Sequence, residues 1–329
     1  MKVTELRKLL NNTNEEVLKK ALVEVYKLVP TGKKQDADFV IENVLSGNSP
    51  KTPKPVEKVD YSKLSAEINR FLENAYAQNY YAPNKVISKK ERPKWRFYVK
   101  RYVKELDKVP FDSDFYNEAV ELLIKLYRMM SYACDYYLFS SEDTFQSVGI
   151  SQYDFYKIVT EKTLAKGFTD ETITTLVICS ATGGLSRMSL HIEQETLLLS
   201  YLNTNDVLQL TVNKSKELVT AATNKYVKEN GYSSRRFFLE REIHNFCDVI
   251  LMSKIKLGEF EDGLVYYFDH VKERDLEVTL YCALDLIEMY TEDDELWIKC
   301  YEYAVKCRNV EPRDYLKESY KRKLEKQNV

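Results

Sequence analysis

Hydrophobic residues recur at helical spacing along almost the whole chain, beginning near the N-terminus. Between residues 15 and 28 the apolar positions lie on one helix face, at Val17, Leu18, Ala21, Leu22, Val25 and Leu28. A second pattern, DADFVIENVLSG, ends at Gly47. We therefore expect an N-terminal helical unit over residues 1–46. The next stretch, NSPKTPKPVEK, has no apolar period, and its prolines and lysines predict a linker or surface loop over 47–60.

Further helical patterns follow one another across residues 61–312. In RPKWRFYVKRYVKEL the inward positions form one stripe, at Trp95, Tyr98, Val99, Tyr102, Val103 and Leu106. The pattern in 114–139 is apolar over most of its surface, which predicts a central helix. Residues 169–184 are rich in β-branched side chains and permit a strand. A helix is favoured there, because Thr169 or Asp170 can cap its start and glycines can end it.

Proline and glycine placement supports an all-α fold. Seven of the eight prolines lie in the first 110 residues, and the eighth is Pro312. Proline costs about 3 kcal/mol inside a helix, so a long helical array would exclude it in this way. The nine glycines are few for a β-rich chain, which needs many for its turns.

Residues 240–307 carry a repeat-like layout. A helix is expected to end at Leu257 and Gly258, Phe260 to enter the next helix, and Gly263 to lie at a close helix contact. A shift of 33 residues places Leu264 on Trp297, Phe268 on Tyr301 and Val271 on Ala304. This stretch resembles the tetratricopeptide class of helical-hairpin repeats, whose period is near 34. The resemblance implies an irregular α-solenoid of stacked helical hairpins, with tetratricopeptide-like packing near the C-terminus. Residues 313–329 predict a basic C-terminal helix or tail.

Composition and motifs narrow the function classes. No apolar run approaches the roughly 20 residues of a membrane span, and the charged N-terminus has no signal-peptide core, so we expect a cytoplasmic protein without a membrane segment.

The six cysteines include no C-x-x-C pair and are expected to be reduced. Only three histidines are present, too few and too scattered to predict a zinc site. No nucleotide or hydrolase motif occurs. SATGGLS is interpreted as a glycine helix stop followed by a new N-cap at Ser186. We expect no cofactor, no metal and no enzymatic activity.

Charge is distributed unevenly along the chain. Residues 85–104 hold nine bases and one acid, whereas residues 259–296 hold thirteen acids and two bases. Arg96, Lys100 and Lys104 form a ladder at four-residue spacing, opposite the apolar stripe. The ladder could face solvent, an acidic protein surface or nucleic acid, and the acidic surface could be this chain's own 259–296 segment or that of a second copy. The candidate partner-binding residues of this basic zone are Lys89, Lys90, Arg92, Arg96, Lys100, Arg101 and Lys104.

Tyrosine is frequent, with 25 residues, and most lie beside leucine and valine in core positions. The exception is NAYAQNYYAPNK, where Tyr76, Tyr80 and Tyr81 lead into a loop and are predicted to form an exposed recognition patch. The leading hypothesis is a helical-repeat scaffold or adaptor that binds another protein. The alternative is a helical-repeat nucleic-acid-binding protein that uses residues 85–104. An enzyme of unfamiliar type would instead need a deep pocket with convergent polar groups.

Overall fold

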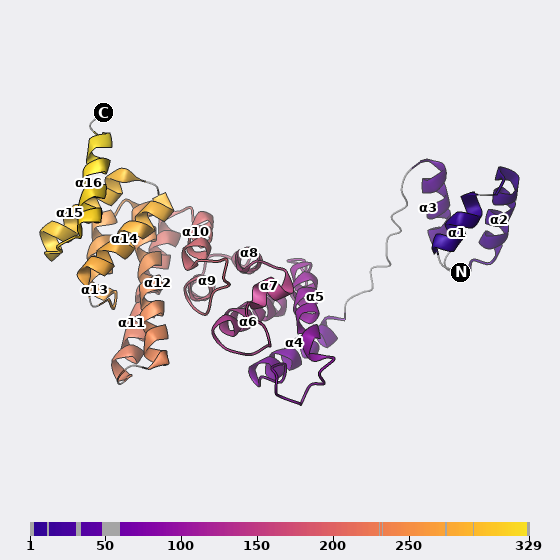
Figure 1. Cartoon of the computed structure of the whole chain (residues 1–329), viewed down its shortest axis with the longest axis horizontal. Coiled ribbons are helices and arrows are strands. Elements are labelled where there is room, and N and C mark those ends of the chain that lie inside the picture. The colour runs from indigo at the N-terminus through magenta and orange to yellow at the C-terminus, as the bar shows by residue number, and fades with distance from the viewer. Residues whose placement is uncertain are drawn as a thin grey trace. The chain divides into compact units, whose positions relative to one another are not determined.

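The computed structural model describes residues 3–11, 13–30, 34–47, 60–229, 231, 233–273, 275–291 and 293–327. Helices are the only regular secondary structure in these ranges, which confirms the all-α prediction (Figure 1). The chain divides into two compact units, residues 1–60 and 61–329. Most of the predicted linker, residues 48–59, lies outside the described residues. No helix among the described residues is long and apolar enough to cross a membrane.

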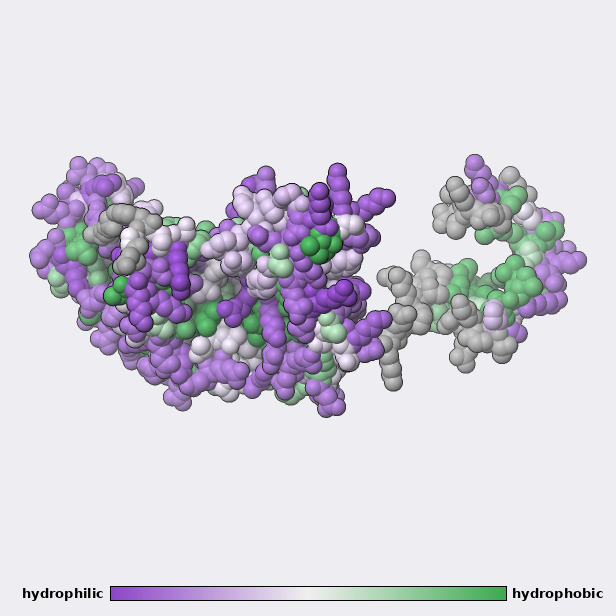
Figure 2. Space-filling view, turned by 90° about the horizontal axis from the view of Figure 1, so that it is seen from below, coloured by the Kyte–Doolittle hydropathy of each residue, from purple (hydrophilic) through white to green (hydrophobic). Residues whose placement is uncertain are grey.

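The first unit contains three short helices, α1 (Val3–Asn11), α2 (Glu15–Lys27) and α3 (Lys34–Leu45). The Asn14 side chain caps α2 by accepting the Val17 N–H. The Tyr26 hydroxyl joins α2 to α3 through a 2.6 Å hydrogen bond to Asp38. No residue of α2 is buried, and hydrophobic residues are visible on the surface of this unit in Figure 2. The apolar spacing in this region therefore forms a helix face without forming a buried core.

The second unit begins with six α-helices and one short 3-10 helix. Their bounds are α4 (Tyr61–Tyr76), η2 (Arg92–Lys94), α5 (Trp95–Asp107), α6 (Tyr116–Asp135), α7 (Thr144–Val148), α8 (Gln152–Leu164) and α9 (Asp170–Ala181). The stripe predicted for α5 is buried at Trp95, Val99, Tyr102, Val103 and Leu106, while Tyr98 is half-buried. Helix α6 packs against α4, α5 and α8. Its extensive burial confirms a central helix.

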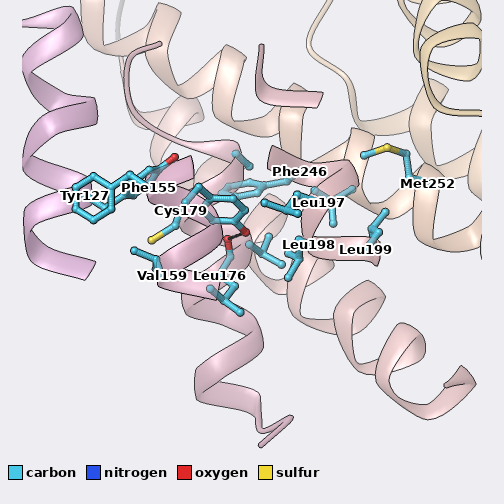
Figure 3. Packing of buried hydrophobic residues seen from close by; sticks show 14 of the residues in the cluster. Tyr127, Phe155, Val159, Leu176, Cys179, Leu197, Leu198, Leu199, Phe246 and Met252 are labelled. Atoms are coloured by element: carbon cyan, nitrogen blue, oxygen red, sulfur yellow. Dashed lines mark hydrogen bonds between the residues drawn. The ribbon is translucent and has the colours of Figure 1, made fainter. Parts of the chain in front are cut away.

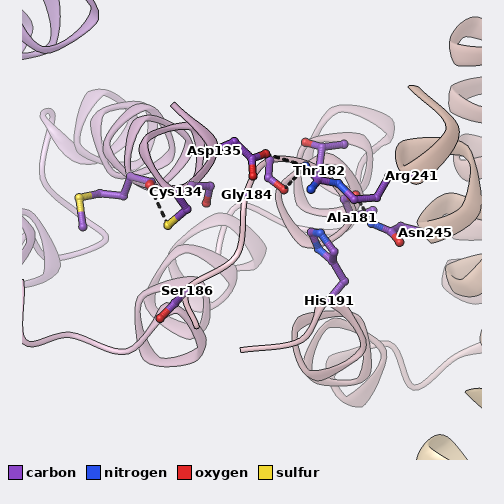
Figure 4. Close-up of polar contacts among 12 residues, drawn as sticks. Cys134, Asp135, Ala181, Thr182, Gly184, Ser186, His191, Arg241 and Asn245 are labelled. Atoms are coloured by element: carbon purple, nitrogen blue, oxygen red, sulfur yellow. Dashed lines mark hydrogen bonds and ion pairs between the residues drawn. The ribbon is translucent and has the colours of Figure 1, made fainter. Parts of the chain in front are cut away.

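Residues 169–186 form helix α9 and then a segment that crosses closely over α6; they do not form a strand. Thr169 caps α9 with its side chain. After the helix, Gly183 and Gly184 run against α6, and a Cβ on Gly184 would lie 2.8 Å from the Asp135 backbone nitrogen. Arg241 holds this crossing through bonds to the Asp135 carboxylate and the Gly183 carbonyl (Figure 4). The N-cap expected at Ser186 is wrong, because the next helix begins at His191 and the Ser186 hydroxyl donates to Asp143.

The remaining helices of the second unit are α10 (His191–Tyr201), α11 (Asn205–Lys228), α12 (Ser234–Leu257), α13 (Phe260–His270), α14 (Leu276–Thr291), α15 (Asp294–Arg308) and α16 (Asp314–Gln327). Helix α12 packs along α11 and α13, and α14 packs along α15. Gly258 ends α12 in the left-handed conformation. A Cβ on Gly263 would lie 3.0 Å from Leu251 and Lys254, so the predicted close contact is present.

The core of the second unit is continuous across consecutive helices. In Figure 3, buried side chains of α6, α8, α9, α10 and α12 lie in one layer. Tyr127 contacts Phe155 and Tyr156 of α8, at 5.6 Å between ring centroids in each case. On the face shown in Figure 2, hydrophilic residues cover most of this unit, with smaller hydrophobic patches between them. Those patches, together with unpaired surface charges, mark where a partner could bind.

Candidate functional site

The charged ladder lies on the outer side of α5. Arg96, Lys100 and Lys104 are exposed, as the helical spacing requires when Trp95, Val99 and their neighbours turn inward. None of the three forms an ion pair with any residue that the structure describes. Like charges at four-residue spacing cost about 0.2–0.5 kcal/mol per pair. An anionic partner would relieve that cost.

Two other bases of the 85–104 zone, Lys94 and Arg101, have carboxylate partners. Lys94 binds Glu91 at 2.6 Å and lowers the pKa of that carboxyl. Arg101 binds Glu67, which also accepts the Tyr102 hydroxyl at 3.0 Å. Both members of the Arg101–Glu67 pair are more than 40% exposed, so the pair contributes little to stability. Arg101 is therefore partly engaged within the fold, unlike the ladder.

Several acids of the acidic segment pair with cations from other parts of the chain. Lys323 of α16 binds Asp294 at 2.5 Å, and Arg308 of α15 binds Asp269 at 2.7 Å. Arg313 binds Glu277 at 3.0 Å. Within the described ranges, no ion pair joins residues 85–104 to residues 259–296. In these ranges the ladder therefore does not pair with the acidic segment of its own chain, which was one of the possibilities that the sequence left open.

The three candidate tyrosines have different environments. Tyr76 is 51% exposed and Tyr81 is partly buried. Tyr80 is only 7% exposed, with its ring 5.3 Å from Phe71 and 5.8 Å from Phe139. The expected exposure is wrong for Tyr80, because residues 76–81 fold back onto the end of α6 and the segment after it.

Tyr76 begins a row of neighbouring rings that sequence reasoning did not assemble. It lies 5.8 Å from Tyr132, which stacks on Tyr136 at 4.3 Å. Tyr136 lies 5.7 Å from Phe238, which contacts Phe237 at 5.8 Å. We call these five residues the aromatic row. It crosses from α4 to α6 to α12, and four of its members, all except Phe238, are at least 39% exposed.

Tyr81, beside this row in the chain, stacks on Tyr137 at 5.5 Å. The Gln78 side chain donates to the Tyr137 carbonyl at 3.0 Å and ties the two segments together. Two of the three predicted tyrosines thus contact aromatic residues that come from the end of α6.

A groove of about 840 Å³ lies beside the aromatic row. Tyr76 and Tyr132 line it together with Arg128 of α6 and Glu242 of α12. Burial raises the pKa of Glu242, although nearby cations oppose that rise. Burial also raises the pKa of Tyr76. The groove combines aromatic, cationic and anionic side chains, a mixture found at protein interfaces.

A buried titratable cluster lies between α10 and α12. Glu195 is fully buried, and neither carboxylate oxygen has a hydrogen-bond partner among the described residues. Burial, followed by the charge of nearby Asp248, raises the pKa of Glu195 well above its usual value. Burial likewise raises the pKa of Asp248, while His244 opposes the rise. The Tyr267 hydroxyl contacts His244 at 2.7 Å. Ionisation of Glu195 is therefore disfavoured both by its burial and by the charge of Asp248.

Sequence reasoning missed this cluster because isolated charged residues in a helix are usually exposed. The only available signal was that Glu195 lies two positions before three consecutive leucines, in HIEQETLLLSYL. Among the described residues, no group of three or more histidine, cysteine, aspartate or glutamate side chains could hold a metal ion.

No protein-family model, curated protein or solved structure matches this chain.

Proposed function

We propose that this chain is a non-enzymatic helical-repeat protein that binds another protein as a scaffold or adaptor. In this proposal the second unit is an irregular α-solenoid of stacked hairpins, with tetratricopeptide-like packing near the C-terminus. The observation that carries the proposal is the aromatic row. Exposed aromatic side chains that touch one another across three helices are typical of interface centres, where tyrosine, phenylalanine and arginine are enriched.

Two further features support a protein partner. The row belongs to helices anchored in the core, so little side-chain or backbone freedom would be lost on binding. Arg241 lies over the Phe238 ring at 5.1 Å, and Arg128 lines the adjoining groove. The ladder on α5 adds positive charge that would speed association with an acidic partner.

The experiment is a comparative affinity capture with the full chain. We expect proteins retained by the wild type to be lost from a variant carrying Tyr76→Ala, Tyr132→Ala and Phe237→Ala, because each substitution removes about 1–2 kcal/mol or more at an interface centre. A matched control carries Phe111→Ala and Phe168→Ala, which remove exposed aromatic rings outside the row. The control should retain the same proteins. Equal retention by both variants and the wild type would refute the proposal.

Nucleic acid is the second candidate, and one observation favours it. Phe97 is 61% exposed, and the Arg96 guanidinium lies over its ring at 5.0 Å. An exposed ring beside a cationic ladder could stack on an unpaired base while the ladder follows the phosphates. Most other aromatic residues of α5 are buried, which limits such stacking to Phe97.

Fluorescence anisotropy with a single-stranded oligonucleotide tests this alternative. Binding should weaken steeply with salt, because about three phosphate contacts would release their counterions. Changing Lys100, Arg101 and Lys104 to glutamate should abolish binding, and Phe97→Ala should weaken it by about 1–3 kcal/mol. Binding that is indifferent to both changes would eliminate this function.

A further inference from the structure

A hollow of about 410 Å³ lies where η2 and the start of α5 face the segment around α7. Lys89, Arg92 and Arg96 line one part of it, and Ser140, Ser141 and Ser147 line another. The cations and the serines are separated by more than 40 positions in the sequence, so no local sequence motif predicts the site. None of the residues that line the hollow is acidic.

The three cations are not paired within the fold. None of them forms an ion pair with a described residue, and the Arg92 Nε is buried without a hydrogen-bond partner among those residues. A buried guanidinium donor without a partner is rare in native proteins and requires an explanation. Arg92 also lines the hollow, so an anion bound there would lie beside this guanidinium.

The nearest acidic residues in the chain are engaged elsewhere. Glu91 binds Lys94 at 2.6 Å, and Glu142 binds Arg187 at 2.8 Å. Asp143 accepts hydrogen bonds from the Gln146 N–H, the Ser186 hydroxyl and the Arg187 N–H. Burial opposes its ionisation, but these hydrogen bonds keep the pKa of Asp143 below its usual value. Its negative charge is thus already compensated, and the hollow keeps its positive character.

Ser140 can supply a neutral donor. Its Oγ accepts the Ala82 N–H at 3.1 Å, which leaves its own O–H to donate. The Ser141 hydroxyl donates to the Asp143 carbonyl at 2.9 Å and contacts the Ser147 hydroxyl at 2.7 Å, so the hydroxyl protons of Ser141 and Ser147 are already engaged. Hydroxyl donors beside guanidinium and ammonium groups are the side chains that surround tetrahedral oxyanions in proteins.

We propose that this hollow binds the phosphoryl group of a phosphomonoester. The planar fork of a guanidinium fits two phosphate oxygens at once, and three cations favour a dianion over a singly charged carboxylate. The volume falls within the range of small-ligand pockets, about 300–1,000 Å³, and exceeds what the phosphoryl group alone fills. Pro93 and the edges of Tyr80 and Trp95 complete the wall and would contact the esterified group. The inference does not depend on the aromatic row, which shares no residue with the hollow.

Isothermal titration calorimetry of the full chain tests the site, with inorganic phosphate, O-phosphoserine and a blocked Ala-phosphoserine-Ala peptide as probes. All three should bind saturably, and the unphosphorylated peptide should not bind. Tighter binding of the phosphopeptide than of O-phosphoserine would assign the ester to a protein. The reverse order would assign it to a small metabolite. Absence of saturable binding by every phosphorylated probe up to about 10 mM would overturn the proposal.

Variants separate this site from its surroundings. Arg92→Gln should weaken O-phosphoserine binding about tenfold or more, because it removes a charge-assisted bidentate contact. Lys89→Gln and Ser140→Ala should each weaken it about threefold, and both residues are exposed enough to change without unfolding the chain. The matched control is Lys104→Gln. Lys104 lies on α5, as Arg96 does, but outside the hollow, and this variant should bind like the wild type. Tyr132→Ala should also leave binding unchanged, so that failure here and failure of the protein-binding proposal are distinguishable. Wild-type affinity in folded Arg92→Gln and Lys89→Gln proteins would overturn the proposal.

Discussion

The basic zone at 85–104 and the acidic segment at 259–296 have opposite charge and opposite outcomes in the folded chain. Several acids of the acidic segment are paired with cations that come from α12, α15, α16 and the segment before α16, such as Lys323 and Arg308. The ladder on α5 has no such partner among the described residues. Charge therefore contributes to packing within the fold in the acidic segment, whereas the ladder's charge remains available to a partner.

The difference follows from what each helix packs against. Helix α16 carries more bases than acids and packs against α15, so that Lys323 meets acidic residues of the preceding helices. Helix α5 packs through its apolar stripe onto α6, and its ladder points away from that contact. The contrast predicts that charge changes will affect stability in the first region and binding in the second.

Reversing Lys323 should have the largest effect on stability. Its side chain is 16% exposed, contacts Asp294 and Glu288, and lies over the Trp297 ring at 5.2 Å. Lys323→Glu should lower the free energy of unfolding by about 2–4 kcal/mol, because it places three carboxylates together in a partly buried site. Urea unfolding followed by circular dichroism measures the change. Lys104→Glu is the control and should cost less than about 0.5 kcal/mol; equal costs would remove the contrast.

As the pH is lowered, the C-terminal helices should lose stability at a higher pH than α5 does. The hydrogen bond from Lys323 lowers the pKa of Asp294, and bonds from Lys306 and Tyr320 lower the pKa of Glu302. Because the folded pKa values are depressed, this stabilisation is complete above the unfolded values of about 4 and is lost as pH falls below them. The loss should be only about 1 kcal/mol, since the carboxyls are about one-third exposed.

The chain's two tryptophans separate the regions in that experiment, because Trp95 lies in α5 and Trp297 in α15. In Trp95→Phe protein, Trp297 emission should shift to the red at a higher pH than Trp95 emission does in Trp297→Phe protein. Asp294→Asn should reduce the difference. Coincident transitions in the two proteins would mean that the C-terminal ion pairs do not set the acid response.

A smaller effect should separate two bases within the basic zone. Arg101→Ala breaks the pair with Glu67 and should lower the free energy of unfolding by about 0.5 kcal/mol, as exposed pairs do. Lys104→Ala should change it by about zero, because Lys104 has no ion pair with a described residue. Thermal unfolding by calorimetry checks both variants; a larger cost for Lys104→Ala would show that the ladder is held by contacts within the fold.

The smallest effect should be a gain in stability. Lys100→Glu replaces two repulsive contacts, with Arg96 and Lys104, by two attractive ones and should raise the free energy of unfolding by about 0.5 kcal/mol. The gain should shrink in about 1 M salt, where surface charges are screened. Destabilisation by this change at low salt would indicate that Lys100 already has an anionic neighbour.

Periodicity predicted the features that depend on local spacing. The buried stripe of α5, the cap at Thr169 and the close approach at Gly263 each depend on a few neighbouring residues. Features that depend on distant segments could not be predicted. Tyr80 is buried because Phe139 lies against it. The serines of the hollow come from α7 and the segment before it, which no local pattern connects to Arg92.

The ladder and the aromatic row differ in the same way in how far the sequence predicts them. The ladder was predictable as an exposed face, and Tyr76 was predictable as an exposed residue near a helix end. The aromatic row was not, since Phe237 and Phe238 lie about 160 residues beyond Tyr76. Only the packing of α12 near α6 brings these rings together.

The crossing of Gly183 and Gly184 over α6 has a consequence for how the sequence can change over time. A methyl group at Gly184 would overlap Asp135 backbone and side-chain atoms, at 2.7–2.8 Å, and one at Gly183 would lie 2.9 Å from Ser131. Asp135 in turn holds Arg241, so any larger residue would disturb two helices at once. Surface helices of this chain can drift freely, but a descendant that keeps this fold must keep the glycine pair. Gly-Gly, with an aspartate 49 positions before its second glycine and an arginine 57 positions after it, is therefore the fingerprint by which distant homologues should be recognisable.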